Sequence, residues 1–184
     1  MKPFFIAGHN EKEQGAKAYN DVYEHHYTKE LQWLVVQDYN DVCVTDCEHL
    51  SLSETIGKIN GNSSPGDIVL DFHFNNNNPK ARGTEIFIYE HSKPDIRELA
   101  SLMVSDAAKL LNTPLRRHIG ERDYKYPVDI GRRLAMIYDV NIPVILVEVC
   151  FLNEFDLPKY ISMKRKVSAI YANRLRDYFS KKVK

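Results

Sequence analysis

The sequence has few of the features that would place it outside the class of ordinary globular domains. Its three cysteines, Cys43, Cys47 and Cys150, are odd in number and lack the spacing of a disulfide framework. No apolar run is long enough to span a bilayer. The 25 basic residues are balanced by 25 acidic ones, so the chain lacks the basic surplus that nucleic-acid binding usually needs. The length of 184 residues fits one domain over residues 1–184.

Two further patterns are missing. The amino terminus has no secretory signal, because residues 3–7 read as a buried strand and no small-residue cleavage site follows an apolar stretch. The helical His-Glu-x-x-His pattern of many zinc peptidases is also absent. Cys43 and Cys47 have a spacing that zinc could accept, but no second Cys/His pair follows nearby, so we interpret them as free thiols.

The elements that the sequence does contain alternate along the chain. Short apolar runs predict strands over residues 4–8, 41–45, 67–74, 84–89 and 143–149. Helical periodicity predicts helices over residues 16–38, 52–59, 95–111, 130–138 and 160–179, with an irregular segment over 112–128. This alternation predicts an α/β fold in which helices flank a mostly parallel sheet.

Three polar residues lie where ordinary strands would not place them. His9 follows the first strand, His73 follows Ile68-Val69-Leu70-Asp71-Phe72, and Glu148 interrupts the apolar run that begins at Val144. Sites in parallel α/β sheets gather outside the carboxyl ends of the strands. A carboxylate in a buried strand is costly unless it is paired, protonated or close to a metal. Glu148 is therefore either a structural residue bonded to an arginine or a functional carboxylate.

Two histidines and one carboxylate are a common ligand set for a catalytic zinc ion whose fourth position is left to water. The residues alone leave the carboxylate ligand open between Glu24 and Glu30. Glu24 opens the amphipathic stretch and can point back toward the strand ends, whereas Glu30 lies deeper in the helix and can equally be a solvated charge. Glu11 and Glu13, in the loop after His9, fit solvent-exposed positions better.

Several short segments resemble a known family when they are taken together. They are Ile6-Ala7-Gly8-His9, Gly15-Ala16 with Glu24 before a helix, His73-Phe74-Asn75, Gly83-Thr84-Glu85-Ile86, and the run from Asn141 to Leu152. In this order they span almost the whole chain, and they resemble the catalytic domain of the zinc-dependent N-acetylmuramoyl-L-alanine amidases. The chain departs from the family where Asn10-Glu11 replaces Gly-Gly and where Cys150 replaces a glycine, without loss of a ligand.

The resemblance implies a fold, a site and an activity. It implies an about six-stranded, mostly parallel sheet with helices on both faces, in a phosphorylase/hydrolase-like arrangement. It implies that His9, Glu24 and His73 bind Zn²⁺ and that Glu148 is the catalytic carboxylate, because Glu24 follows Gly15-Ala16 at the family spacing. The bond hydrolysed would join N-acetylmuramic acid to the L-alanine of the peptidoglycan stem peptide. The alternatives are a zinc peptidase that cuts within the stem peptide and a non-catalytic wall-binding module.

The irregular segment over residues 112–128 is long and polar, which is typical of loops that carry function. We predict that Arg116, Arg117 and Arg122 bind stem-peptide carboxylates and that Asn75 also contacts substrate. Asp71 or Asn75 could orient His73 from behind. We further expect a monomer that acts at the bacterial cell wall or in the periplasm. Without a leader it would stay cytoplasmic until released, like a phage endolysin, unless a leader has been trimmed.

Overall fold

The computed structural model describes residues 1–43, 49–76, 80–116 and 122–182. In these residues four strands form one sheet: β1 (Pro3–Ala7), β2 (Ile68–Asn75), β3 (Glu85–Ile88) and β4 (Val144–Phe151). The strand order is β1-β2-β4-β3, with β1, β2 and β4 parallel and β3 antiparallel to β4. The predicted α/β class is therefore confirmed, but the sheet of the described residues is mixed and has four strands rather than six.

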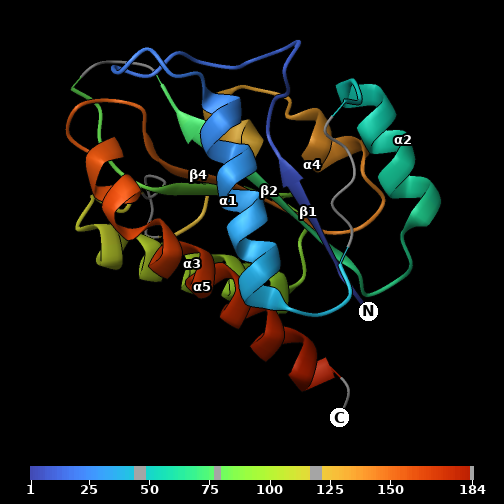
Figure 1. Cartoon of the computed structure of the whole chain (residues 1–184). Coiled ribbons are helices and arrows are strands. Elements are labelled where there is room, and N and C mark those ends of the chain that lie inside the picture. Colours follow the sequence, from blue (N-terminus) through green and yellow to red (C-terminus); the bar gives the residue numbers. More distant parts are fainter. Residues whose placement is uncertain (44–48, 77–79, 117–121, 183–184) are drawn as a thin grey trace.

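Helices cover both faces of this sheet (Figure 1). The helices α1 (Glu24–Tyr39), α3 (Pro94–Leu111) and α5 (Leu157–Lys182) pack on one face. The helices α2 (Leu52–Asn62) and α4 (Ala135–Asp139) pack on the other. Both ends of the chain lie at the lower side of Figure 1, opposite the carboxyl ends of the parallel strands. The carboxyl edge is thus left to loops, where a site can form.

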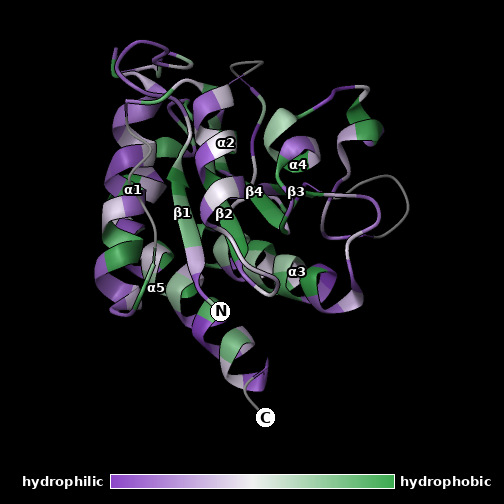
Figure 2. Ribbon diagram, turned by 90° about the vertical axis from the view of Figure 1, so that its right-hand side faces the viewer, coloured by the Kyte–Doolittle hydropathy of each residue, from purple (hydrophilic) through white to green (hydrophobic). Residues whose placement is uncertain are grey.

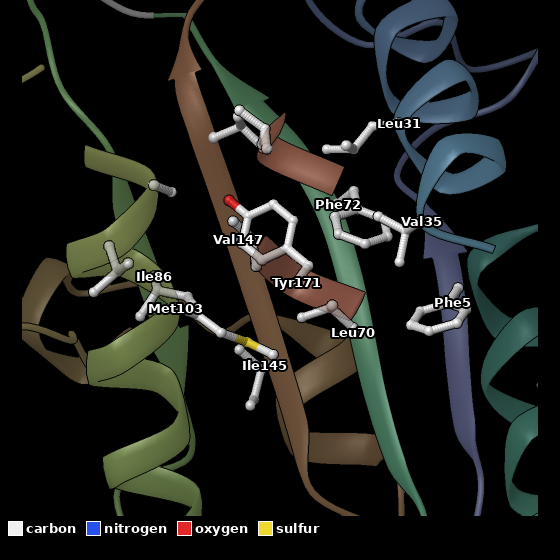
Figure 3. Close-up of a cluster of buried hydrophobic side chains, with 14 of the residues drawn as sticks. Phe5, Leu31, Val35, Leu70, Phe72, Ile86, Met103, Ile145, Val147 and Tyr171 are labelled. Atoms are coloured by element: carbon white, nitrogen blue, oxygen red, sulfur yellow. The ribbon is translucent and has the colours of Figure 1, made fainter. Parts of the chain in front are cut away.

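The larger core lies beneath α1, α3 and α5. Alternate residues of the strands point into it, as expected for a period of two. Figure 3 shows side chains from the sheet meeting those of the three helices, namely Phe5, Leu31, Val35, Leu70, Phe72, Ile86, Met103, Ile145, Val147 and Tyr171. The other residues of each strand face α2 and α4, where the smaller core includes Phe4, Val69 and Leu146. In Figure 2 the strands are mainly green, which fits a sheet that is buried on both faces.

The strand predicted over residues 41–45 is absent from residues 41–43, the part of it that the structure describes. Asn40 ends α1 in the left-handed conformation, and Asp41 and Val42 form a bend, so the chain turns where a strand was expected. Residues 44 and 45 lie outside the described ranges. At the β3 edge of the sheet, the described residues add two single bridges, at Thr84–Leu115 and Phe87–Lys125.

Two helices begin later than the periodicity predicted. The first was expected from residue 16 but starts at Glu24, because Asp21 has a positive φ and Lys17 bridges Tyr23 in a tight turn. The second was expected over 130–138 but starts at Ala135, after a short 3-10 helix (Pro127–Ile130) and a left-handed Gly131. Residues 112–116 and 122–126 contain no helix, as predicted for this irregular segment. Among the described helices, none combines the length and apolar character that crossing a bilayer requires.

Candidate metal centre and active-site cleft

The carboxyl ends of β2 and β4 and the start of β3 carry a row of polar side chains. His73 of β2 is in register with Glu148 of β4, which is in register with Glu85 of β3. Residues in register on neighbouring strands project from the same face, so these three side chains share the face covered by α2 and α4. Asp71 lies two residues before His73 on this same face. The sequence therefore concentrates polar groups at one corner of an otherwise apolar sheet.

His9 reaches this corner from the end of β1. The backbone of Gly8 donates to Phe72 O at 2.8 Å, and His9 then adopts a positive φ of 67° that turns its side chain over the sheet. A Cβ atom at Gly8 would lie 2.3 Å from Cε1 of His73. Only a residue without a side chain allows the backbone to approach the His73 ring so closely.

Glu24 is the first residue of α1 and its side chain is buried. Its Oε1 lies 3.1 Å from Nδ1 of His73, and its Oε2 lies 3.3 Å from Nε2 of His9. The backbone N–H of Phe74 donates to Oε1 at 3.0 Å, and that of Ala16 donates to Oε2 at 3.2 Å. The carboxylate is thus held in one orientation between the two imidazoles.

The three side chains form a group that could hold a metal ion. His9, Glu24 and His73 each offer one ligand atom, and these atoms lie within 4.8 Å of one another. Gly15 leaves room for them, since a Cβ atom there would lie 2.6 Å from His9 and 2.7 Å from Glu24. Glu30, the other candidate, forms an ion pair with Lys164 on α5 instead. Two imidazole nitrogens and one carboxylate oxygen suit zinc, so the donor set fits this ion.

The charges of the group reinforce one another. Burial raises the pKa of Glu24, but the hydrogen bonds from His73 and His9 lower it more, so the pKa lies well below its usual range. Burial lowers the pKa of His73, but Asp71 and Glu24 raise it more, so the pKa lies well above its usual value. Glu24 and His73 therefore stabilise the charged form of each other.

Asp71 lies behind His73. Its Oδ2 is 3.4 Å from Nε2 of His73, while Nδ1 of the same ring faces Glu24. Both carboxylate oxygens of Asp71 are buried and have no hydrogen-bond partner among the described residues. Of the two residues proposed to orient His73, the structure brings Asp71 to the ring, whereas Asn75 donates to Glu85.

Glu148 lies beside His73 with no arginine bound to it in the described part of the chain. Its Oε2 is buried without a hydrogen-bond partner there. Burial raises the pKa of Glu148 to about 8; His73 opposes this shift, and the carboxylates of Glu24, Glu85 and Asp71 add to it. The side chain of Glu148 is half-buried, and no lysine or arginine of the described residues pairs with it, which does not fit the structural interpretation and does fit a group that exchanges protons.

A cleft of about 760 Å³ opens beside this corner. His9, His73, Glu148, Asn75 and Arg116 all line it. Arg116 also stacks on Phe151, with 5.1 Å from its Cζ to the ring centroid. Arg122 does not line the cleft; it pairs with Asp129 at 3.1 Å and stacks on Tyr126 at 4.0 Å. Arg117 lies outside the described residues.

The cleft also contains residues that the sequence interpretation missed. Glu85 is buried and binds Asn75, Lys125 and Arg116 together. Its position in the apolar run after Thr84 is the same signal that identified Glu148. Arg132 and Arg133 also line the cleft, in a segment where the sequence predicted only a helix. Cys43 is a free thiol, as interpreted, and Cys150 is also free, whereas Cys47 lies outside the described residues.

A known protein family and several solved structures match this chain. The family model for N-acetylmuramoyl-L-alanine amidase matches residues 4–175. A search of curated protein sequences gives no match. Several solved structures share the fold over nearly their whole length.

One such structure is an N-acetylmuramoyl-L-alanine amidase from Clostridium difficile 630, with 17% identity, a TM-score of 0.79, and coverage of 97% of this chain and 96% of that one. The catalytic domain of CwlV, an amidase from Bacillus (Paenibacillus) polymyxa var. colistinus, has 17% identity, a TM-score of 0.78 and coverage of 97% and 98%. The catalytic domain of the CD27L endolysin, described as targeting Clostridia difficile, has 17% identity, a TM-score of 0.74 and coverage of 96% and 97%. At these identities the likeness establishes the fold.

Proposed function

The chain belongs to the N-acetylmuramoyl-L-alanine amidase family, and from that premise we propose that His9, Glu24 and His73 bind one zinc ion and that Glu148 is the catalytic carboxylate. The family hydrolyses the amide bond that joins N-acetylmuramic acid to L-alanine in peptidoglycan, and the chain is an enzyme of this class. The observation that carries the proposal is the Glu24 carboxylate held between two histidines, next to Glu148, whose Oε2 has no hydrogen-bond partner in the part of the chain that the structure describes.

Zinc bound at this site would lower the pKa of a water molecule and would polarise the scissile carbonyl. Glu24 is suited to binding it because two backbone N–H groups fix its carboxylate. Asp71 faces the Nε2 atom of His73, which leaves Nδ1 on the Glu24 side, free to act as the ligand atom. The glycines at positions 8 and 15 keep space open for the ligand side chains.

Glu148 performs the proton transfer. As a carboxylate it takes a proton from the attacking water while the new C–O bond forms at the lactyl carbonyl. It then gives that proton to the alanine nitrogen as the C–N bond breaks, so that the amine leaves in neutral form. The products are a glycan with a free lactyl carboxylate and a stem peptide with a free amino terminus.

We further propose that residues 1–184 act as a single catalytic domain and as a monomer on peptidoglycan at the cell wall or in the periplasm. Release in the manner of an endolysin and export with a leader that is later trimmed both remain compatible with this site. A zinc peptidase that cuts within the stem peptide would need the same metal chemistry. A wall-binding module without activity would not need a partnerless Glu148 beside the metal ligands.

Metal analysis of three variants tests the proposed ligands. We expect one zinc per wild-type chain, and loss of both zinc and activity in His73→Ala and in Glu24→Gln. The matched control is Glu30→Gln, six residues further along α1, which removes only a surface ion pair with Lys164 and should keep both. Full zinc occupancy in Glu24→Gln together with its loss in Glu30→Gln would show that the wrong carboxylate has been assigned.

A further inference from the structure

Two depressions of different character meet at the proposed metal ligands. Beside the cleft of about 760 Å³ lies a second pocket of about 230 Å³, between β1, β2, α2 and α4. The two share His9, His73, Leu134 and Leu146. A substrate whose scissile bond lies at this cluster must therefore extend into one depression on its amine side and into the other on its acyl side.

The larger cleft is rich in cations. Four of its lining side chains are basic: Arg116, Lys125, Arg132 and Arg133. Arg116 and Lys125 are engaged with Glu85, and Arg133 is paired with Asp139. Arg132 is exposed, and in the described part of the chain no carboxylate forms an ion pair with it. The cleft can therefore pair Arg132 with an anionic group of a ligand.

The smaller pocket has the opposite chemistry. None of the described residues that line it is a lysine or an arginine, and its walls include the apolar side chains of Leu50, Leu52 and Met136. Its carboxylates are Glu13 and the buried Asp71, neither of which is paired with a lysine or arginine in the described residues. This pocket disfavours an anion and favours apolar groups together with N–H or O–H donors.

Glu148 lies on one side only. It lines the larger cleft and is not among the residues of the smaller pocket. Since the leaving nitrogen must receive its proton from Glu148, the amine half of the substrate has to lie on the side of the larger cleft. The position of Glu148 and the distribution of charge therefore both favour the larger cleft for the amine half of the substrate.

The two halves of the substrate differ in charge, as the two depressions do. The stem peptide, on the amine side, carries free carboxylates. The acyl side carries the lactyl methyl group and the acetamido group of muramic acid, which are neutral and partly apolar. We propose that the enzyme binds its substrate in one orientation, with a stem-peptide carboxylate on Arg132 in the larger cleft and the lactyl-muramic acid half in the pocket of Leu50 and Leu52. This orientation rests on the proposed amidase function.

Zinc-loaded enzyme and three muropeptides of disaccharide and stem peptide test the orientation. The first is unmodified, the second has its stem carboxylates amidated, and the third has a glycolyl group in place of the lactyl group, which removes one methyl. We expect the wild-type enzyme to prefer the first over the second by up to about fivefold in kcat/KM, which is the usual worth of one charge pair at an open site. We expect it to prefer the first over the third by about tenfold or more, which is the usual worth of one methyl group in an apolar pocket.

Substitutions should remove the two preferences separately. Arg132→Ala should abolish the preference for free carboxylates and keep that for the lactyl methyl group, whereas Leu50→Ala with Leu52→Ala should do the reverse. Ile161→Ala, which removes an exposed apolar side chain on α5 away from both depressions, should change neither.

The orientation would be overturned if Arg132→Ala removed the preference for the lactyl methyl group and the double leucine variant removed the preference for free carboxylates. A wild-type enzyme with neither preference would also overturn it. Failure of the wild-type enzyme to release a stem peptide from the unmodified muropeptide would instead refute the proposed function. The first two results concern only how the substrate lies, and the third concerns the reaction, so the two kinds of failure are distinguishable.

Discussion

At the scale of single residues, Glu148 separates a structural from a catalytic interpretation. A structural carboxylate would lose an ion pair when changed to glutamine, but Oε2 of Glu148 has no partner to lose among the described residues. We therefore expect Glu148→Gln to keep its zinc and its melting temperature while its rate of peptidoglycan hydrolysis falls about a hundred- to ten-thousandfold. Zinc content, thermal melting and the rate of wall solubilisation measure these three quantities, and near-normal activity would refute the catalytic role.

The same residue makes the stability of the metal-free protein depend on pH. Because burial raises the pKa of Glu148 to about 8, its ionised form is disfavoured in the folded state. The contribution of Glu148 to stability is then fully present below about pH 4.5, the value of the unfolded chain, and is lost as the pH rises through about 8. Metal-free Glu148→Gln should therefore unfold at a higher denaturant concentration than metal-free wild type at pH 8.5, and at a similar one at pH 4.5. A lower midpoint for the variant at pH 8.5 would contradict this sign.

At the scale of elements, the metal site depends on Gly8 after β1 and on Gly15 before α1 as well as on the ligand residues, because a side chain at either glycine would collide with a ligand. A methyl group at Gly8 would meet the His73 ring at 2.3 Å and the backbone of Phe72 at 2.5 Å, so the strand end or the ring must shift. We expect Gly8→Ala to weaken zinc binding by at least tenfold, measured by competition with a chelator, since metal sites tolerate only small displacements of their ligands.

Gly57→Ala is the matched control for that substitution. Gly57 lies in α2, and a Cβ atom there would meet nothing within 4 Å. Alanine favours a helix over glycine by up to about 1 kcal/mol, so this variant should keep its zinc affinity and be slightly more stable. Equal zinc affinity of Gly8→Ala and Gly57→Ala would mean that the close approach at Gly8 does not position His73.

The elements also show what the sequence could predict. The helices α2, α3 and α5 and the strands β1 to β4 were predicted to within a few residues, because burial gives a helix a period of 3.6 residues and gives a strand that is covered on both faces a continuous apolar run. The late start of α1 was missed because it depends on a positive φ at Asp21, a conformation that no periodicity reports. Glu85 was missed although it interrupts an apolar strand as Glu148 does. Its partners Lys125 and Arg116 lie in irregular chain whose described residues join the sheet through single bridges, and no sequence pattern reports such bridges.

At the scale of the whole molecule, the order β1-β2-β4-β3 explains why the site forms where it does. It places the ends of β1 and β2 next to each other and puts β4 on the other side of β2, so that His9, His73 and Glu148 converge although 139 positions separate the first from the last. The sequence predicted that these residues lie at strand ends, but the strand order, and with it the division into a cationic and an apolar depression, came from the structure.

The most direct test of the account is a mass analysis of purified peptidoglycan after digestion by zinc-loaded enzyme, with Glu148→Gln as the control. We expect intact stem peptides that begin with a free L-alanine amino group and glycan strands that carry free lactyl carboxylates, and about a hundred- to ten-thousandfold slower release of both with the variant. Stem-peptide fragments together with glycan that still carries L-alanine would contradict it, because the bond cut would then lie within the peptide.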